Sequence, residues 1–171
     1  MAGGQAVVAM TASALEAGLQ QAVPVLARTF RDPWWIIGSA AMALAGVPDI
    51  VPQDIDVLCS HDDADRLRLR WRMHEAGDSR PRDGMRFRSA FSRYEHLPVP
   101  LEAMGGLEVM TADGWRALEV REDIRTVHAG CELRLPTLAE QRRILHLFGR
   151  DKDLAKAARL AAFMEEATGV A

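Results

Sequence analysis

One short pattern in the first third of the chain restricts the possible folds most strongly. The apolar run at 34–37 leads directly into Gly38 and Ser39, helix-forming residues extend to Gly46, and the residues at 54–58, Asp-Ile-Asp-Val-Leu, open a second apolar run. A short, continuous apolar run is typical of a strand that is covered on both faces. The pattern therefore predicts a strand, a tight turn, a short helix and a second strand that carries two aspartates.

The two aspartates, Asp54 and Asp56, stand at alternate positions. Side chains two apart on a strand point to the same face, so these carboxylates are expected to project together while Ile55 and Val57 face the core. Neighbouring carboxylates repel each other unless a cation neutralises them, and oxygen ligands of this kind suit Mg²⁺ or Mn²⁺. Asp54 and Asp56 are therefore candidate metal ligands.

The turn at Gly38 and Ser39 is the candidate phosphate site. A strand that runs into a helix start directs free backbone N–H groups, and the positive end of the helix dipole, at whatever lies in front of it. A small residue such as Gly38 lets the backbone approach a ligand closely, and Ser39 adds a hydroxyl donor. Together with the aspartates, this turn predicts a site for a metal-bound triphosphate.

The rest of the sequence predicts an α+β fold, a two-layer mixed β-sheet flanked by helices, with further helices at the C-terminus. Four more helices are expected, at 11–30, 61–77, 137–149 and 150–167. Five short strands are expected, at 85–91, 97–103, 107–110, 124–130 and 131–136. Gly105 and Gly106 are expected to form a turn between two of these strands. Residues 66–73 also permit a strand, because basic and apolar residues alternate there.

Length and composition favour a single globular domain over 1–171, with its core at about 30–135 and a C-terminal helical segment at about 137–168. The chain has 171 residues, 49% of them hydrophobic, and a formal charge of −3, which argues against a polycation that coats nucleic acid. No apolar run approaches the ~20 residues of a membrane span and no secretory signal is recognisable, so a cytoplasmic protein is expected. Cys59 and Cys131 have no CxxC partner and are expected to be buried free thiols.

Two segments resemble the nucleotidyltransferase superfamily that includes DNA polymerase beta. The residues at 36–46, Ile-Ile-Gly-Ser-Ala-Ala-Met-Ala-Leu-Ala-Gly, with those at 54–58, are similar to the strand, turn, short helix and DxD strand of its minimal, antibiotic-modifying and AbiEii-like toxin branches. The residues from Gly149 to Asp153 are similar to the Gly-Arg-x-Lys-Asp segment that opens a late helix in AbiEii-like relatives. The resemblance spans residues 34–160, most of the chain.

The resemblance implies an enzyme that moves a nucleoside monophosphate from an NTP to an acceptor hydroxyl with Mg²⁺ or Mn²⁺ as cofactor. Asp54 and Asp56 would be catalytic metal ligands. A third carboxylate is expected on a neighbouring strand facing this pair. Glu102 is the preferred candidate, because Val99 and Leu101 alternate with it as core positions, and Glu108 is the alternative.

The resemblance further implies that Arg150 and Lys152 bind the nucleotide phosphates, with Asp153 orienting either the lysine or the helix start. Two departures favour a second interpretation: relatives often carry a basic residue and a threonine before DxD, where this chain has Ile-Val-Pro-Gln at 50–53, and a lysine where it has Arg142 and Arg143. The alternative function is a noncatalytic nucleotide- or protein-binding module of the same fold, such as a toxin–antitoxin component.

The sequence leaves the partners of the protein open. The acceptor is a small molecule, a tRNA end or a protein side chain, and a second copy of the chain or an antitoxin would fit a pocket that this short chain leaves incomplete. The eight arginines between 66 and 88, with Trp71 and Phe87 among them, form a basic region that either binds a polyanion such as RNA or is a solvated face diluted by acids. Signatures of P-loop NTPases, GxSxG hydrolases, dinucleotide-binding enzymes and HExxH proteases are absent from the sequence.

Overall fold

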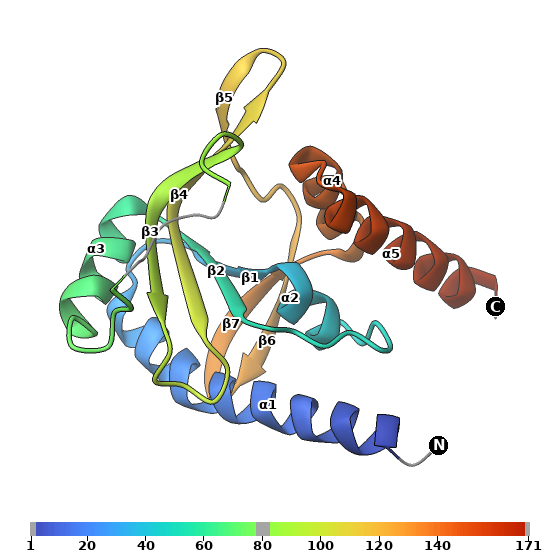
Figure 1. The fold of residues 1–171 in the computed structure, drawn as a ribbon, viewed down its shortest axis with the longest axis horizontal. Helices are drawn as coiled ribbons and strands as arrows, with labels where there is room; N and C mark the ends of the chain where they lie inside the picture. Colours follow the sequence, from blue (N-terminus) through green and yellow to red (C-terminus); the bar gives the residue numbers. More distant parts are fainter. Residues whose placement is uncertain (1–2, 78–82, 170–171) are drawn as a thin grey trace.

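The computed structural model describes residues 3–77 and 83–169, with the backbone alone for residues 3–12. It shows an α+β fold with a mixed sheet flanked by helices, as the sequence predicts (Figure 1). The elements in chain order are α1 (Gly3–Thr29), β1 (Trp35–Ile37), α2 (Gly38–Leu44), β2 (Ile55–Cys59), α3 (His61–Arg70), β3 (Phe87–Tyr94), β4 (Leu101–Thr111), β5 (Gly114–Ala117), β6 (Asp123–His128), β7 (Cys131–Pro136), α4 (Leu138–Phe148) and α5 (Asp151–Gly169).

The main sheet has the strand order β1-β2-β4-β3, and β5 pairs with the far part of β4. Strand β2 is antiparallel to β1 and parallel to β4, while β3 and β5 are both antiparallel to β4. Strands β6 and β7 form a separate hairpin. The β4–β5 hairpin extends beyond the rest of the sheet at the top of Figure 1.

Strand β2 is buried on both of its faces, which explains its almost continuous apolar sequence. Ile55 and Val57 are fully buried on the face that packs against α1 and α3. Leu58 is buried on the opposite face, in a second cluster to which α4 contributes Ile144 and Phe148. Because alternate residues share a face, Asp54 and Asp56 lie on the α4 side of the sheet.

The C-terminal helices pack against α2 as well as against the sheet. Met42 of α2 lies in one apolar cluster with Leu145 of α4 and with Ala157 and Leu160 of α5. Thr137 caps α4 by accepting a hydrogen bond from the backbone N–H of Glu140, and α4 ends at Gly149 with positive φ. This packing brings the start of α5 to the side of the sheet that carries the aspartates.

Two expectations about the helices are settled by the structure. Segment 61–70 is a helix, capped by Ser60 with Ala64 and Leu67 buried, so the strand alternative for 66–73 is wrong. Helix α1 begins at Gly3, well before the expected start at 11, and continues through Pro24. Burial of its apolar face against the sheet outweighs the hydrogen bond that the proline removes.

The expected turn at Gly105 and Gly106 is wrong, because both residues lie inside the long strand β4. They serve close packing instead. A Cβ atom on Gly105 would lie 2.5 Å from the Cβ of Ala64, and one on Gly106 would lie 2.2 Å from the ring of His61. The glycines therefore let α3 approach the strand closely.

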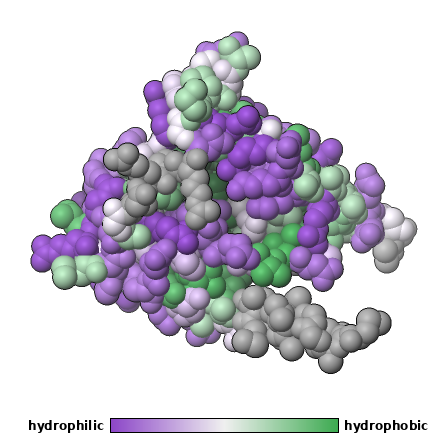
Figure 2. All heavy atoms as spheres, viewed as in Figure 1, coloured by the Kyte–Doolittle hydropathy of each residue, from purple (hydrophilic) through white to green (hydrophobic). Residues whose placement is uncertain are grey.

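Most of the face seen in Figure 2 is hydrophilic, and hydrophobic residues gather in a smaller region near its middle. Within the part of the chain that the structure describes, no helix is both long enough and apolar enough to cross a membrane.

Candidate active site

Three neighbouring strands place charged residues in one line across the sheet. Asp56 of β2 is the register partner of Glu102 on β4, and Glu102 is the register partner of Arg93 on β3. Paired residues on adjacent strands project from the same face about 5 Å apart. Asp54 lies just before β2, and its Oδ2 is 3.6 Å from Nη1 of Arg93. We call Asp54, Asp56 and Glu102 the acid row.

The turn after β1 contacts the acid row directly. Ile37 is the register partner of Asp56, and Gly38 follows with a φ of +66°. A Cβ atom on Gly38 would lie 2.5 Å from Oδ2 of Asp56, so the space for any side chain is taken by this carboxylate. Glycine is thus required at position 38 for two reasons: the backbone there has a positive φ, and the Asp56 carboxylate leaves no room for a side chain. Ser39, half-buried, follows it in the first turn of α2.

The surroundings of Asp56 disfavour its charged form. Burial, followed by the charges of Asp54 and Glu102, raises its pKa to about 7, although the charges of Lys156 and Lys152 oppose this rise. Among the described residues, none donates a hydrogen bond to the Asp56 carboxylate. A partly buried carboxylate between two others, without a donor, has the chemistry of a ligand for a hard divalent cation.

Arg93 supplies positive charge to the row. Its Nη1 donates to Oε1 of Glu102 at 2.5 Å and lies near Asp54, while its Nε donates to Oε1 of Glu95 at 3.0 Å. Within residues 3–77 and 83–169, no three His, Cys, Asp or Glu side chains are already arranged as a metal site. The donor atoms therefore fit Mg²⁺ or Mn²⁺ in type, but two of the three carboxylates are drawn toward the guanidinium.

Glu108, the alternative third carboxylate, lies elsewhere. It belongs to the part of β4 that pairs with β5, and it forms an ion pair with Arg88 of β3. Arg88 also lies over the ring of Trp115, with 4.5 Å between its Cζ and the ring centroid. The structure therefore places Glu102, and not Glu108, beside Asp56.

The two basic residues expected to bind phosphate differ in their surroundings. Arg150 pairs with Asp153 at 2.6 Å and 3.0 Å and stacks over Phe87 and Phe148, so its guanidinium is held in structural contacts. Asp153 is 1% exposed and also accepts from the backbone N–H of Arg150, which agrees with the expected role at the helix start. Lys152 is exposed, and its positive charge acts to lower the pKa of Asp56.

Two residues of this site are not identified by the sequence reasoning. Lys156 lies one helical turn after Lys152 and also lowers the pKa of Asp56. Its spacing of four from Lys152 is a signal that was available in the sequence. Arg93 has no comparable signal, because its place beside Glu102 depends on the register of β3 and β4.

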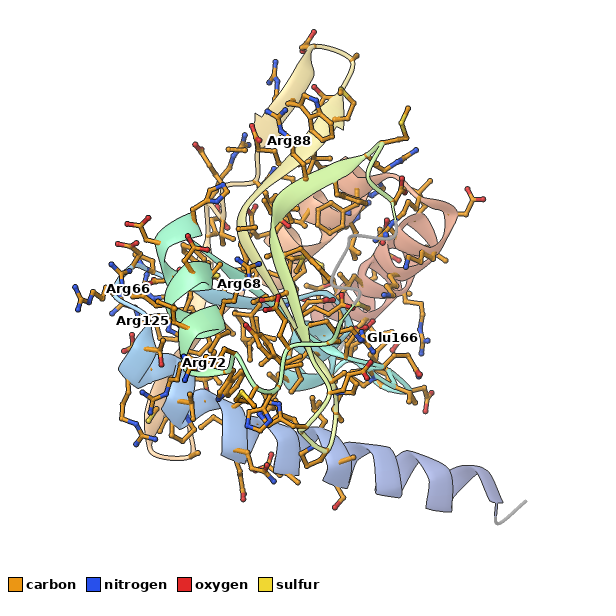
Figure 3. All side chains as sticks on the ribbon, turned by 60° about the vertical axis from the view of Figure 1, so that its left-hand side comes forward. Arg66, Arg68, Arg72, Arg88, Arg125 and Glu166 are labelled. Atoms are coloured by element: carbon orange, nitrogen blue, oxygen red, sulfur yellow. The ribbon has the colours of Figure 1, made fainter. Side chains whose placement is uncertain are left out.

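The basic region between 66 and 88 does not form one patch in the described part of the chain; Arg80 and Arg82 lie outside it. Figure 3 shows Arg66, Arg68 and Arg72 around α3 and Arg88 near the β4–β5 hairpin. Several members are paired: Arg66 with Asp63, Arg68 with Asp65 and Glu75, and Arg88 with Glu108. These arrangements favour the solvated face over a polyanion site.

Both cysteines are free thiols. Cys59 is buried, and burial together with the charge of Asp63 raises its pKa to about 12. Cys131 is only half-buried. Neither thiol lies in the acid row, so no cysteine chemistry is assigned to this site.

Comparison with known proteins supports the fold. No protein-family model matches the chain, and no curated protein matches it significantly. The crystal structure of a provisionally assigned nucleotidyltransferase from Thermotoga maritima is similar, with a TM-score of 0.63 and 19% identity over 85% of this chain and 92% of that chain. At this identity the likeness shows the fold, so the chain has a nucleotidyltransferase-like fold.

Proposed function

We propose that the protein is a nucleotidyltransferase that uses Mg²⁺ or Mn²⁺ to move a nucleoside monophosphate from an NTP to an acceptor hydroxyl. One observation supports this proposal above all: the carboxylate of Asp56, which is in register with Glu102, fills the space beside Gly38 that a side chain would need. The Gly38 turn, which is suited to phosphate, therefore lies next to the carboxylates that are suited to a metal ion. The similar fold of the Thermotoga protein agrees with the proposal.

The proposal gives each residue a role. Asp54, Asp56 and Glu102 hold the divalent cation, which when bound neutralises charge on the triphosphate. The backbone at Gly38 and the Ser39 hydroxyl bind phosphate oxygens, and Lys152 and Lys156 approach the triphosphate from α5. The acceptor oxygen forms a bond to the α-phosphorus, its proton passes to Glu102, and the bond to the leaving pyrophosphate breaks. Arg150 supports the site through Asp153 instead of binding phosphate.

The direct test is binding of labelled NTPs in the presence of Mn²⁺. The wild type should bind, and the double variant Asp54→Asn with Asp56→Asn should not, although circular dichroism shows the same fold. Glu108→Gln is the matched control, since Glu108 lies on the same strand as Glu102 but outside the acid row. Equal binding by the folded double variant would contradict the proposal.

A noncatalytic binding module, such as a toxin–antitoxin component of AbiEii-like type, is the second candidate. The ion pairs of Arg93 with Glu102 and Asp54 favour it, because they leave fewer carboxylates for a metal. Incubation of the protein with labelled NTPs and cell extract separates the two candidates. Label on a small molecule, on RNA or on protein supports transfer and identifies the acceptor class, whereas NTP binding without transfer to any fraction supports the module.

A further inference from the structure

Arg93 contacts two of the three carboxylates of the acid row. Its guanidinium lies 2.5 Å from a Glu102 oxygen and 3.6 Å from an Asp54 oxygen. The side chain is 20% exposed, like that of Glu102, so this contact is only moderately screened by water. A divalent cation shared by these carboxylates would lie a few ångströms from the guanidinium, where the repulsion between like charges is large.

We propose that Arg93 is a built-in competitor of the catalytic cation. In the free protein the guanidinium neutralises Glu102 and Asp54, and it turns away when the metal binds. This inference rests on the proposed function, because it assigns control of metal occupancy to the same carboxylates. It also accounts for the lack of a preformed three-ligand site among the described residues.

The surroundings of Arg93 give it a second position. Strand β3 is at the edge of the sheet, and Arg93 already donates to Glu95, which follows the end of β3. The Glu95 side chain is 61% exposed, so it lies away from the protein interior. The guanidinium can therefore leave Glu102 and keep its bond to Glu95, which lowers the free energy needed to vacate the metal position.

The same sheet contains a matched control. Arg88 is also on β3 and pairs with Glu108 on β4, just as Arg93 pairs with Glu102. Arg88 is outside the acid row, near the β4–β5 hairpin (Figure 3). Removing either arginine changes the net charge of the protein equally. A difference in Mn²⁺ affinity between the two variants therefore reflects where the arginine lies.

The experiment is a Mn²⁺ titration of the intact protein without nucleotide, followed by the electron paramagnetic resonance signal of the free ion. Arg93→Gln should bind Mn²⁺ about tenfold more tightly than the wild type, because the competing charge-assisted bonds are gone. Arg88→Gln should bind like the wild type. Equal affinity of Arg93→Gln and wild type, or weaker binding by Arg93→Gln, would overturn the inference while leaving the proposed function intact.

A second variant keeps the test decisive if Arg93→Gln does not fold. Glu95→Gln removes the alternative partner of Arg93, so the guanidinium should stay on Glu102 and weaken Mn²⁺ binding about threefold. Where Arg93→Gln does fold, Glu95→Gln should have no effect on Mn²⁺ affinity in that background, since Glu95 acts through Arg93. An unchanged affinity of Glu95→Gln, or an equal effect in both backgrounds, would contradict the inference. Absence of Mn²⁺ binding in every variant, with or without NTP, would instead overturn the proposed function.

Discussion

The two ends of the β3–β4 pair carry the same residue types in different settings. Arg93 pairs with Glu102 at one end, and Arg88 pairs with Glu108 at the other. Both side chains of the first pair are 20% exposed, and Asp56 lies on the next strand; the second pair is 53% and 31% exposed and lies beside Trp115.

The difference arises from the neighbour of β4. Strand β2 accompanies β4 only from Leu101 to Gly105, and beyond that point the neighbour is β5, which carries no acid. A glutamate on β4 therefore has Asp54 and Asp56 as neighbours only where β2 lies alongside. Position in the sheet, rather than residue type, decides which Arg–Glu pair is next to the candidate active site.

The largest expected effect contrasts Asp56→Asn with Glu108→Gln. Asp56→Asn should lower the rate of nucleotidyl transfer about 10²–10³-fold, because it removes a charged ligand at the point where Gly38 meets the acid row. Glu108→Gln should leave the rate within about twofold, as expected for an exposed residue outside the site. Single-turnover transfer from labelled NTP measures both. Similar losses of transfer rate in the two variants would contradict the view that the acid row, and not the far end of β4, forms the active site.

A second contrast concerns two glycines with positive φ. Gly38→Ala should destabilise the protein by about 2–5 kcal/mol, because strain adds to the clash with Asp56. Gly46→Ala should be destabilising by only about 1–2 kcal/mol, since its φ is +83° but nothing lies within 4 Å of the added Cβ. Urea denaturation gives both values. Equal destabilisation would mean that the Asp56 carboxylate does not restrict the space beside Gly38.

Arg150 and Lys152 form a third contrast, between structural and functional basic residues. Arg150→Ala should lower the free energy of unfolding by about 3 kcal/mol, because it leaves the buried carboxylate of Asp153 without its ion-pair partner. Lys152→Ala should leave stability unchanged and weaken NTP binding about threefold to tenfold, since Lys152 is exposed near the acid row. Thermal unfolding combined with NTP titration checks both. Lost stability in Lys152→Ala together with weaker NTP binding by a stable Arg150→Ala would contradict these two roles.

The smallest expected effect compares two glutamates whose pKa values are lowered by arginine. Hydrogen bonding to Arg143 lowers the pKa of Glu140, which is 5% exposed, and hydrogen bonding to Arg88 lowers that of the exposed Glu108. A lowered folded-state pKa stabilises the protein above the ordinary glutamate pKa, and this stabilisation is lost as the pH falls through the folded value.

Glu140→Gln should therefore lower the free energy of unfolding by about 1–2 kcal/mol at pH 7 and by less at pH 3, because the stabilisation is lost as the pH falls below the ordinary glutamate pKa and through the lowered folded-state value. Glu108→Gln should change the stability in the same direction but much less, because water screens its ion pair with Arg88. Urea titrations at both pH values measure the difference. A loss for Glu140→Gln that is as large at pH 3 as at pH 7 would assign the effect to packing instead of charge.

Local patterns in the sequence predict much of this structure. The apolar runs identify β1 and β2, the alternation of Asp54 and Asp56 places both on one face, and Thr137 identifies the start of α4. Each of these features depends on residues that are close in the chain, where propensity and periodicity act directly.

Features that depend on distant residues were not predictable in the same way. The continuity of β4 through Gly105 and Gly106 is set by α3, because Ala64 and His61 take the space of the missing side chains. The contact of Arg93 with Glu102 is set by the register of β3 on β4. A shift of one residue would turn Arg93 to the other face, and no pattern within either strand fixes that register.

The central claim is that Asp54, Asp56 and Glu102 bind a divalent cation opposite Gly38. Anomalous diffraction from crystals soaked with Mn²⁺ and a nonhydrolysable NTP tests it most directly. The account predicts an anomalous peak within about 2.0–2.6 Å of oxygens of the acid row, with phosphate at the Gly38 turn and Arg93 turned away from Glu102. Nucleotide and Mn²⁺ bound elsewhere, or an acid row that keeps its bonds to Arg93 with saturating ligand present, would contradict it.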